Sequence, residues 1–153
     1  MQVKNVVLFG HRELYEHAKV EKKLSVILRH LALTNPYVEI YMGRNGEFDT
    51  FVASIIKQFK KVSGFENIGM TLVLPYEHKD IEYYAQYYDS VFIPESLHGI
   101  HPKRAITERN KWMVNKCDLL ICYVKHGYGG AHTALKYAKN EGKKIINLAE
   151  DEK

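Results

Sequence analysis

The sequence predicts an α/β fold in which helices cover both faces of a mostly parallel central sheet. Short apolar runs of strand length alternate along the chain with longer segments whose apolar residues recur at helical spacing. Residues 118–124 form a nearly continuous apolar run, as expected of a central strand covered on both faces. Strands that alternate with helices are typical of βαβ units, in which neighbouring strands run parallel. The expected architecture is therefore Rossmann-like and three-layered.

The composition is that of a globular protein, with 46% hydrophobic and 26% charged residues among 153. No repeat or linker interrupts the chain, so we expect a single domain over residues 1–153. The N-terminal apolar run is too short for a signal peptide, and no stretch is long enough to span a bilayer. Cys117 and Cys122 are expected to be buried thiols of a reducing compartment. We therefore expect a cytoplasmic protein with no membrane partner and no metal site.

The first half of the chain predicts three strands and two helices. The strands are expected at residues 3–9, 37–42 and 68–74. The first helix is expected from about His17 to Leu33, because Asn35 and Pro36 break the pattern that precedes them. The second helix has the clearest apolar stripe in the chain and is closed by Gly64. Its stripe consists of Phe48, Phe51, Val52, Ile55, Ile56, Phe59 and Val62.

The second half predicts three more strands, separated by helices. Pro75 stops the third strand, a short Tyr-rich helix follows at residues 79–88, and a brief strand at 90–93 leads into an irregular loop at 94–101. Pro102 is tolerated in a first helical turn, so it is expected to open a helix that reaches about Lys116. After the strand at 118–124, a Gly-rich loop leads into a helix to about Asn140, and the last strand is expected at 144–148.

In such sheets the ligand binds beyond the carboxyl ends of the strands, near the point where the strand order reverses. The first expected strand ends at Gly10, His11 and Arg12. Gly10 allows a tight turn, while His11 and Arg12 could donate hydrogen bonds to a phosphate. The alternative is an ordinary βα turn with exposed polar side chains.

The second strand ends in a segment with two glycines, Gly43 and Gly46, placed just before the strongest helix. This spacing allows the backbone to approach a ligand closely and aims free N–H groups at an anion. Glu47 and Asp49 follow in the first helical turn. Glu47 either complements the helix dipole or serves as a ribose-hydroxyl acceptor or catalytic carboxylate, whereas a capping role is favoured for Asp49.

The strongest signal is the loop that opens the last helix, with Gly127, Gly129 and Gly130 within four residues. Free amides at a helix N-terminus predict a phosphate site, with Thr133 as an additional donor. We expect these amides, directly after the strand at 118–124, to be unpaired and to converge on an anionic group near Arg109. The loop matches neither a Walker loop nor the dinucleotide fingerprint, and no cofactor is expected.

Three segments resemble one known superfamily. Residues 108–113, then Asp118 at the head of an apolar strand, then the loop at 127–133 are similar to the SMF/DprA–LOG (SLOG) superfamily. Its phosphoribohydrolase branch, the LOG enzymes, carries an Arg-Lys-x-x-Met segment and a Pro-Gly-Gly-x-Gly-Thr-x-x-Glu loop in the same order. Residues 43–49 and 143–148 resemble the YpsA-like branch, which has a Gly-x-Glu-Phe-Asp type of motif.

The resemblance implies that Arg109 lies at the active site and that Gly129, Gly130 and Thr133 belong to the phosphate-binding loop. Three departures from the hydrolase pattern matter: Tyr128 replaces the proline, His132 replaces the third glycine, and Lys136 stands at the position of the catalytic glutamate. An ammonium group cannot replace a catalytic carboxylate, which puts the usual hydrolase mechanism in doubt. The resemblance also implies a homodimer formed through helices near the site, with which the apolar stretch at 112–114 is compatible.

The leading hypothesis is a sensor or ligand-binding module that holds a nucleotide, an ADP-ribose-like molecule or a related nucleoside phosphate without turning it over. The alternative is an N-glycosidase, nucleoside deoxyribosyltransferase-like enzyme or phosphoribohydrolase that uses Glu47 as nucleophile or general base, with Arg109 holding the phosphate. A nucleic-acid partner ranks last. The superfamily includes a DNA-processing branch, but the formal charge of +4 comes without any recognised binding motif.

Overall fold

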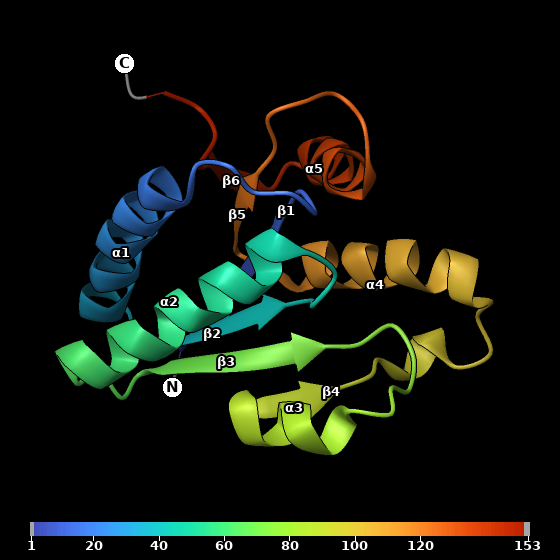
Figure 1. Ribbon diagram of the computed structural model, residues 1–153, viewed down its shortest axis with the longest axis horizontal. Coiled ribbons are helices and arrows are strands. Elements are labelled where there is room, and N and C mark those ends of the chain that lie inside the picture. Colours follow the sequence, from blue (N-terminus) through green and yellow to red (C-terminus); the bar gives the residue numbers. More distant parts are fainter. Residues whose placement is uncertain (1, 152–153) are drawn as a thin grey trace.

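The computed structural model describes residues 2–151 and contains a six-stranded sheet with helices on both faces (Figure 1). The ends of the expected domain, residues 1, 152 and 153, lie outside the described residues. Neighbouring strands are parallel throughout, in the order β4-β3-β2-β1-β5-β6. The strands are β1 (Val3–Gly10), β2 (Tyr37–Met42), β3 (Ile68–Val73), β4 (Ser90–Phe92), β5 (Leu119–Tyr123) and β6 (Lys144–Asn147). The predicted three-layer α/β fold is confirmed.

The helices connect the strands in chain order. They are α1 (His17–Thr34), α2 (Glu47–Ser63), α3 (Ile81–Tyr87), α4 (Pro102–Lys116) and α5 (Gly130–Asn140). The loop expected at 94–101 contains a short 3-10 turn, η1 (Glu95–Leu97). Gly64 ends α2 in the left-handed conformation, with φ of 72°, which glycine adopts without strain. None of the helices within residues 2–151 is both long and apolar enough to cross a membrane.

Two hydrophobic cores lie on opposite faces of the sheet, and the central strands contribute to both. In β1, Val6 and Leu8 face the core shared with α1 and α2, whereas Val7 and Phe9 face the core shared with α4 and α5. Side chains alternate between the faces in the same way along β5. β5 is apolar throughout and β1 is apolar from Val6 to Phe9, because both faces of these stretches are buried.

The order of the strands reverses between β1 and β5. The chain passes from β1 outward to β2, β3 and β4, returns through α4, and places β5 on the other side of β1. The loop after β1 enters α1, which packs on one face, and the loop after β5 enters α5, which packs on the other (Figure 1). Loops that leave for opposite faces open a crevice at the carboxyl ends of these strands.

Several single residues lie where the sequence pattern placed them. Cys117 and Cys122 are free and buried, and burial raises the pKa of the Cys122 thiol to about 12. Met113 and Val114 belong to the core beneath α4. Trp112 keeps partial exposure and packs against the rings of Tyr41 and Phe92, with centroids 5.9 and 5.0 Å away, respectively. The expected homodimer stays a prediction.

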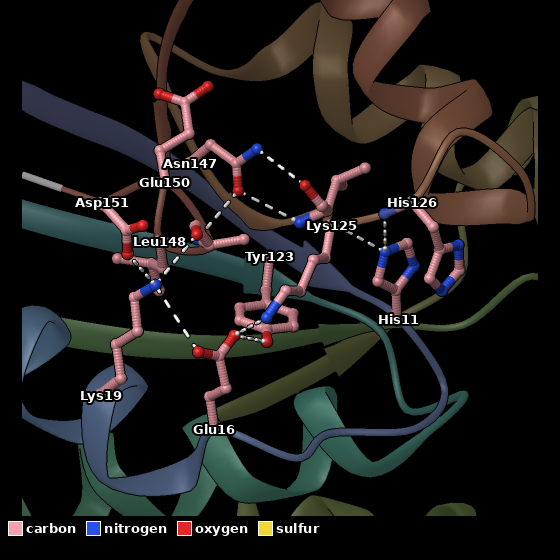
Figure 2. Close-up of polar contacts among 12 residues, drawn as sticks. His11, Glu16, Lys19, Tyr123, Lys125, His126, Asn147, Leu148, Glu150 and Asp151 are labelled. Atoms are coloured by element: carbon pink, nitrogen blue, oxygen red, sulfur yellow. Dashed lines mark hydrogen bonds and ion pairs between the residues drawn. The ribbon is translucent and has the colours of Figure 1, made fainter.

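A polar network around β5 holds the start of the Gly-rich loop (Figure 2). Glu16 accepts hydrogen bonds from the Tyr123 hydroxyl and from Lys125 Nζ, the latter at 2.9 Å. On the β6 side, the Asn147 side chain donates to Val124 O at 3.0 Å and accepts from Val124 N at 3.1 Å. The end of β5 is therefore tied both to the start of α1 and to β6.

This network predicts a pH dependence of stability. The Tyr123 hydroxyl and Lys125 hold the pKa of Glu16 at about 2, below its ordinary value of 4.5. A depressed carboxyl pKa contributes stability that is present above pH 4.5 and is lost as the pH falls toward 2. We expect Glu16→Gln to lower the free energy of unfolding at pH 7 and to have a smaller effect at pH 2.5. Urea unfolding at both pH values measures this, and an equal effect at the two would contradict it.

Candidate functional site

A cavity of about 360 Å³ lies at the reversal point between β1 and β5. It brings together the ends of β1 and β2, the start of α5 and the inner side of α4. The lining residues are Phe9, Gly10, His11, Arg12, Glu13, Gly43, Asn45, Asp49, Ile106, Arg109, Asn110, Met113, His126, Tyr128, Gly129, Gly130 and Ala131. All three strand ends singled out in the sequence thus contribute to one cavity.

Seven of the twelve candidate residues line this cavity: Gly10, His11, Arg12, Gly43, Arg109, Gly129 and Gly130. The other five are absent from its lining: Gly46, Glu47, Gly127, His132 and Thr133. Gly127 is exposed in the Gly-rich loop itself, and Thr133 lines a smaller adjoining pocket beside Gly130.

The Gly-rich loop presents open main-chain amides at the start of α5. Gly129 caps the helix with φ of 93°, a conformation that side chains other than glycine rarely adopt. Among the described residues, the main-chain N–H groups at positions 127–132 have no hydrogen-bond acceptor. The hydroxyl of Thr133, expected as an additional donor, is used within the turn, where it donates to Gly129 O at 3.1 Å.

The first amides of this loop are not free, contrary to expectation. His11 Nε2 accepts from the N–H groups of Lys125 at 2.8 Å and His126 at 3.3 Å (Figure 2). The amide of Val124 is satisfied by the Asn147 side chain. These amides are paired because β1 and β5 are neighbours, which brings the side chain that follows β1 under the loop that follows β5.

The His11 ring is neutral and carries its proton on Nδ1, because Nε2 is the acceptor of two amides. Burial lowers its pKa, and the nearby rings of His126 and His132 act in the same direction. The ring stacks on His126 with centroids 3.6 Å apart, and His126 in turn stacks on Tyr128 at 4.0 Å. The phosphate-donor role that the sequence suggested for His11 is therefore open only through Nδ1–H.

Arg109 is a buried cation, with 2% of its surface exposed, and it lines the cavity. Its Nη1 donates to Val73 O at 2.8 Å and its Nε donates to Asn110 Oδ1 at 2.9 Å. A guanidinium carries five N–H groups. The N–H groups of Arg109 that make neither of these two bonds have no partner among residues 2–151. A Cβ at Gly43 would lie 2.7 Å from Arg109 Nη1, so the glycine makes room for the guanidinium.

Asp49 is the buried carboxylate of the site, with 6% of its surface exposed. Oδ2 accepts from Asn45 N at 2.9 Å, which holds the turn that precedes the N-cap residue Gly46, whereas the sequence favoured a cap of the helix itself. Oδ1 is buried and has no partner among the described residues, and the side chain lines the cavity. Burial raises the pKa of Asp49, while the Asn45 amide, Arg109 and Arg44 oppose that rise. Asp49 therefore does more than cap the turn.

Glu47, the acid that the sequence favoured for function, lies elsewhere. It is exposed at the start of α2, and Oε2 accepts from Leu14 N at 3.4 Å. Its own amide donates to Arg12 O at 2.8 Å, and a Cβ on Gly46 would lie 2.5 Å from Arg12 Cα. Glu47 and Gly46 thus lock the loop after β1 onto the start of α2.

The helical spacing of the sequence could have shown that Asp49, and not Glu47, lies on the buried face of α2. Asp49 precedes Val52 and Ala53 by three and four residues, and both of those are fully buried. Glu47 shares its face with Thr50 and Ser54, which are exposed. The polar residue on the buried stripe was the one placed to reach an interior cavity.

Neither a family model nor a curated protein matches this chain. A search of solved structures found the X-ray structure of DNA processing protein A (DprA) from Streptococcus pneumoniae, with a TM-score of 0.66 and 17% sequence identity. The match covers 93% of this chain and 49% of that one, so this chain spans about half the length of that protein. At this identity the comparison shows a shared fold.

Proposed function

We propose that this chain forms one SLOG-like domain that holds a nucleotide or a nucleotide-derived phosphate ligand, such as an ADP-ribose-like molecule or a nucleoside phosphate. The observation that carries the proposal is the run of main-chain N–H groups at 127–132, which have no acceptor among residues 2–151. They stand at the start of α5, beside the same cavity that Arg109 lines.

The physics of this arrangement favours an anion. The N-terminus of a helix carries a partial positive charge, and its first amides point toward a ligand. Arg109 adds a buried positive charge with unpartnered N–H groups, and charge-assisted hydrogen bonds are the stronger kind. A cavity of about 360 Å³ is in the size range of small-molecule sites. A compact phosphate ligand satisfies all three features.

The second candidate is an N-glycosidic hydrolase or transferase, and one observation favours it: Asp49 supplies a buried carboxylate within the cavity. Binding without turnover ranks first because Lys136 occupies the position of the hydrolase glutamate and Glu47 is not among the cavity residues. Incubation with nucleoside 5′-monophosphates separates the two. Base release that disappears in Asp49→Asn would establish the enzyme.

The binding proposal is tested by removing one amide at the start of α5. Gly130 occupies the first helical position, where proline is tolerated although it lacks an N–H group. We expect Gly130→Pro to weaken AMP or ADP-ribose binding about ten-fold, since a hydrogen bond to a charged group contributes about 1.5–3 kcal/mol. Isothermal titration calorimetry measures the affinity.

Gly130→Ala is the matched control, because a Cβ there meets nothing within 4 Å and the N–H group is kept. Its affinity is expected to equal that of the unmodified protein, and thermal unfolding checks that both variants fold. Equal losses in the alanine and proline variants would contradict a role for the amide. If no phosphate ligand binds to the unmodified protein, the proposed function is wrong.

A further inference from the structure

We infer that Asp49 is the acceptor for the sugar hydroxyls of the bound ligand, so that the cavity selects ribose-bearing phosphates over their deoxy counterparts. The inference rests on the proposed function and adds the class of ligand that the site takes. It assigns to Asp49 a role for which the sequence favoured Glu47.

The first step is the unpartnered oxygen. Asp49 Oδ1 is buried and accepts no hydrogen bond from any described residue. Buried polar atoms in native proteins nearly always have partners, and a buried carboxylate oxygen without one is costly. Because Asp49 lines the cavity, a donor on a bound molecule is the partner that this site can offer.

The second step is that the carboxylate is held in place. Oδ2 is fixed by the Asn45 amide at 2.9 Å, and the residue sits in the first turn of α2 beside Phe48, which is fully buried. A side chain fixed through one oxygen presents the other in a defined direction. It can therefore discriminate between ligands, since a correctly placed acceptor is left unpaired by an analogue that lacks the donor.

The third step is the polarity of the cavity. Its donors are the open amides at the start of α5 and the guanidinium of Arg109, whereas Asp49, on α2, supplies an acceptor. Arg109 and Arg44 lie close enough to Asp49 to oppose the rise in its pKa, so it is the open amides that distinguish the two ends of the cavity, and they place the phosphate at the start of α5. The group toward α2 must donate hydrogen bonds. The sugar is bonded directly to the phosphate, and its hydroxyls are donors that every ribonucleotide carries, whatever its base.

The test compares AMP with 2′,3′-dideoxyadenosine 5′-monophosphate, which differ only in the two sugar hydroxyls. We expect the unmodified protein to bind AMP at least ten-fold more tightly by isothermal titration calorimetry. Asp49→Asn keeps an oxygen for the Asn45 amide and replaces the other with an NH2 group, which cannot accept a hydrogen bond, and we expect it to reduce the preference to less than about three-fold. Glu47→Gln, in the same helical turn but outside the cavity lining, is the matched control and should keep the full preference.

The outcomes separate this inference from the proposed function. Equal affinity of the unmodified protein for the two ligands overturns the inference while phosphate binding stands. This outcome includes the case in which an amine of the base, and not a sugar hydroxyl, donates to Asp49. A preference that survives in Asp49→Asn also overturns it, whatever the result for Glu47→Gln. Binding of neither ligand overturns both proposals. Thermal unfolding of each variant shows whether it folds, and Asp49→Glu, which keeps the charge but moves it, is expected to lose the preference as well.

Discussion

Phe48→Ala is expected to lower the free energy of unfolding by about 3–5 kcal/mol, the usual cost of removing a large buried aromatic side chain. Phe48 is fully buried between the start of α2 and the sheet. Its ring stacks on that of Tyr123, with centroids 6.2 Å apart. On its other contact, a Cβ added at Gly10 would lie only 2.5 Å from Phe48 Cγ. The substitution leaves a void that this close packing prevents from collapsing fully.

Urea unfolding at pH 7 measures the loss. Val62→Ala is the control on the same helix, because Val62 is 74% exposed and its truncation is expected to change stability by less than about 0.5 kcal/mol. A loss below about 1 kcal/mol for Phe48→Ala would show that the start of α2 is not packed as described. Because Asp49 is the next residue, we also expect the variant to weaken ligand binding.

Arg109→Met is expected to weaken the binding of AMP by roughly ten- to a hundred-fold, since charge-assisted hydrogen bonds contribute about 1.5–3 kcal/mol. Arg109 provides the buried positive charge of the cavity, and methionine occupies similar space without a donor. Isothermal titration calorimetry measures the affinity. Arg104→Met is the control, because Arg104 is exposed on the same helix.

Arg109→Lys separates charge from geometry. Lysine keeps the positive charge but lacks the planar fork that reaches Val73 O and Asn110 Oδ1 while presenting further N–H groups to the cavity. We expect it to recover only part of the affinity lost in Arg109→Met. Full affinity in the methionine variant would remove Arg109 from the ligand site.

Much of this fold could be predicted from local patterns. The nearly continuous apolar run at 118–124 predicted a strand covered on both faces, and β5 does contribute to two cores. The stripe beginning at Phe48 predicted α2, and Gly64 marked its end. These features depend on spacing within one element, so a single sequence contains them. The convergence of three strand ends at one cavity also followed, because parallel strands place their carboxyl ends along the same edge.

Tertiary structure decided which groups are available within that cavity. The sequence determined that Gly-rich turns follow the strands and that acids stand in the first turn of α2. Helical spacing separates the buried Asp49 from the exposed Glu47, but only the packing of α2 beside the ends of β1 and β2 brought Asp49 to the cavity. Only the pairing of β1 with β5 brought His11 beneath the amides of Lys125 and His126, which are more than a hundred residues away along the chain. Hydrogen-bond partners of this kind depend on which strands are paired and in what register, which no local pattern encodes.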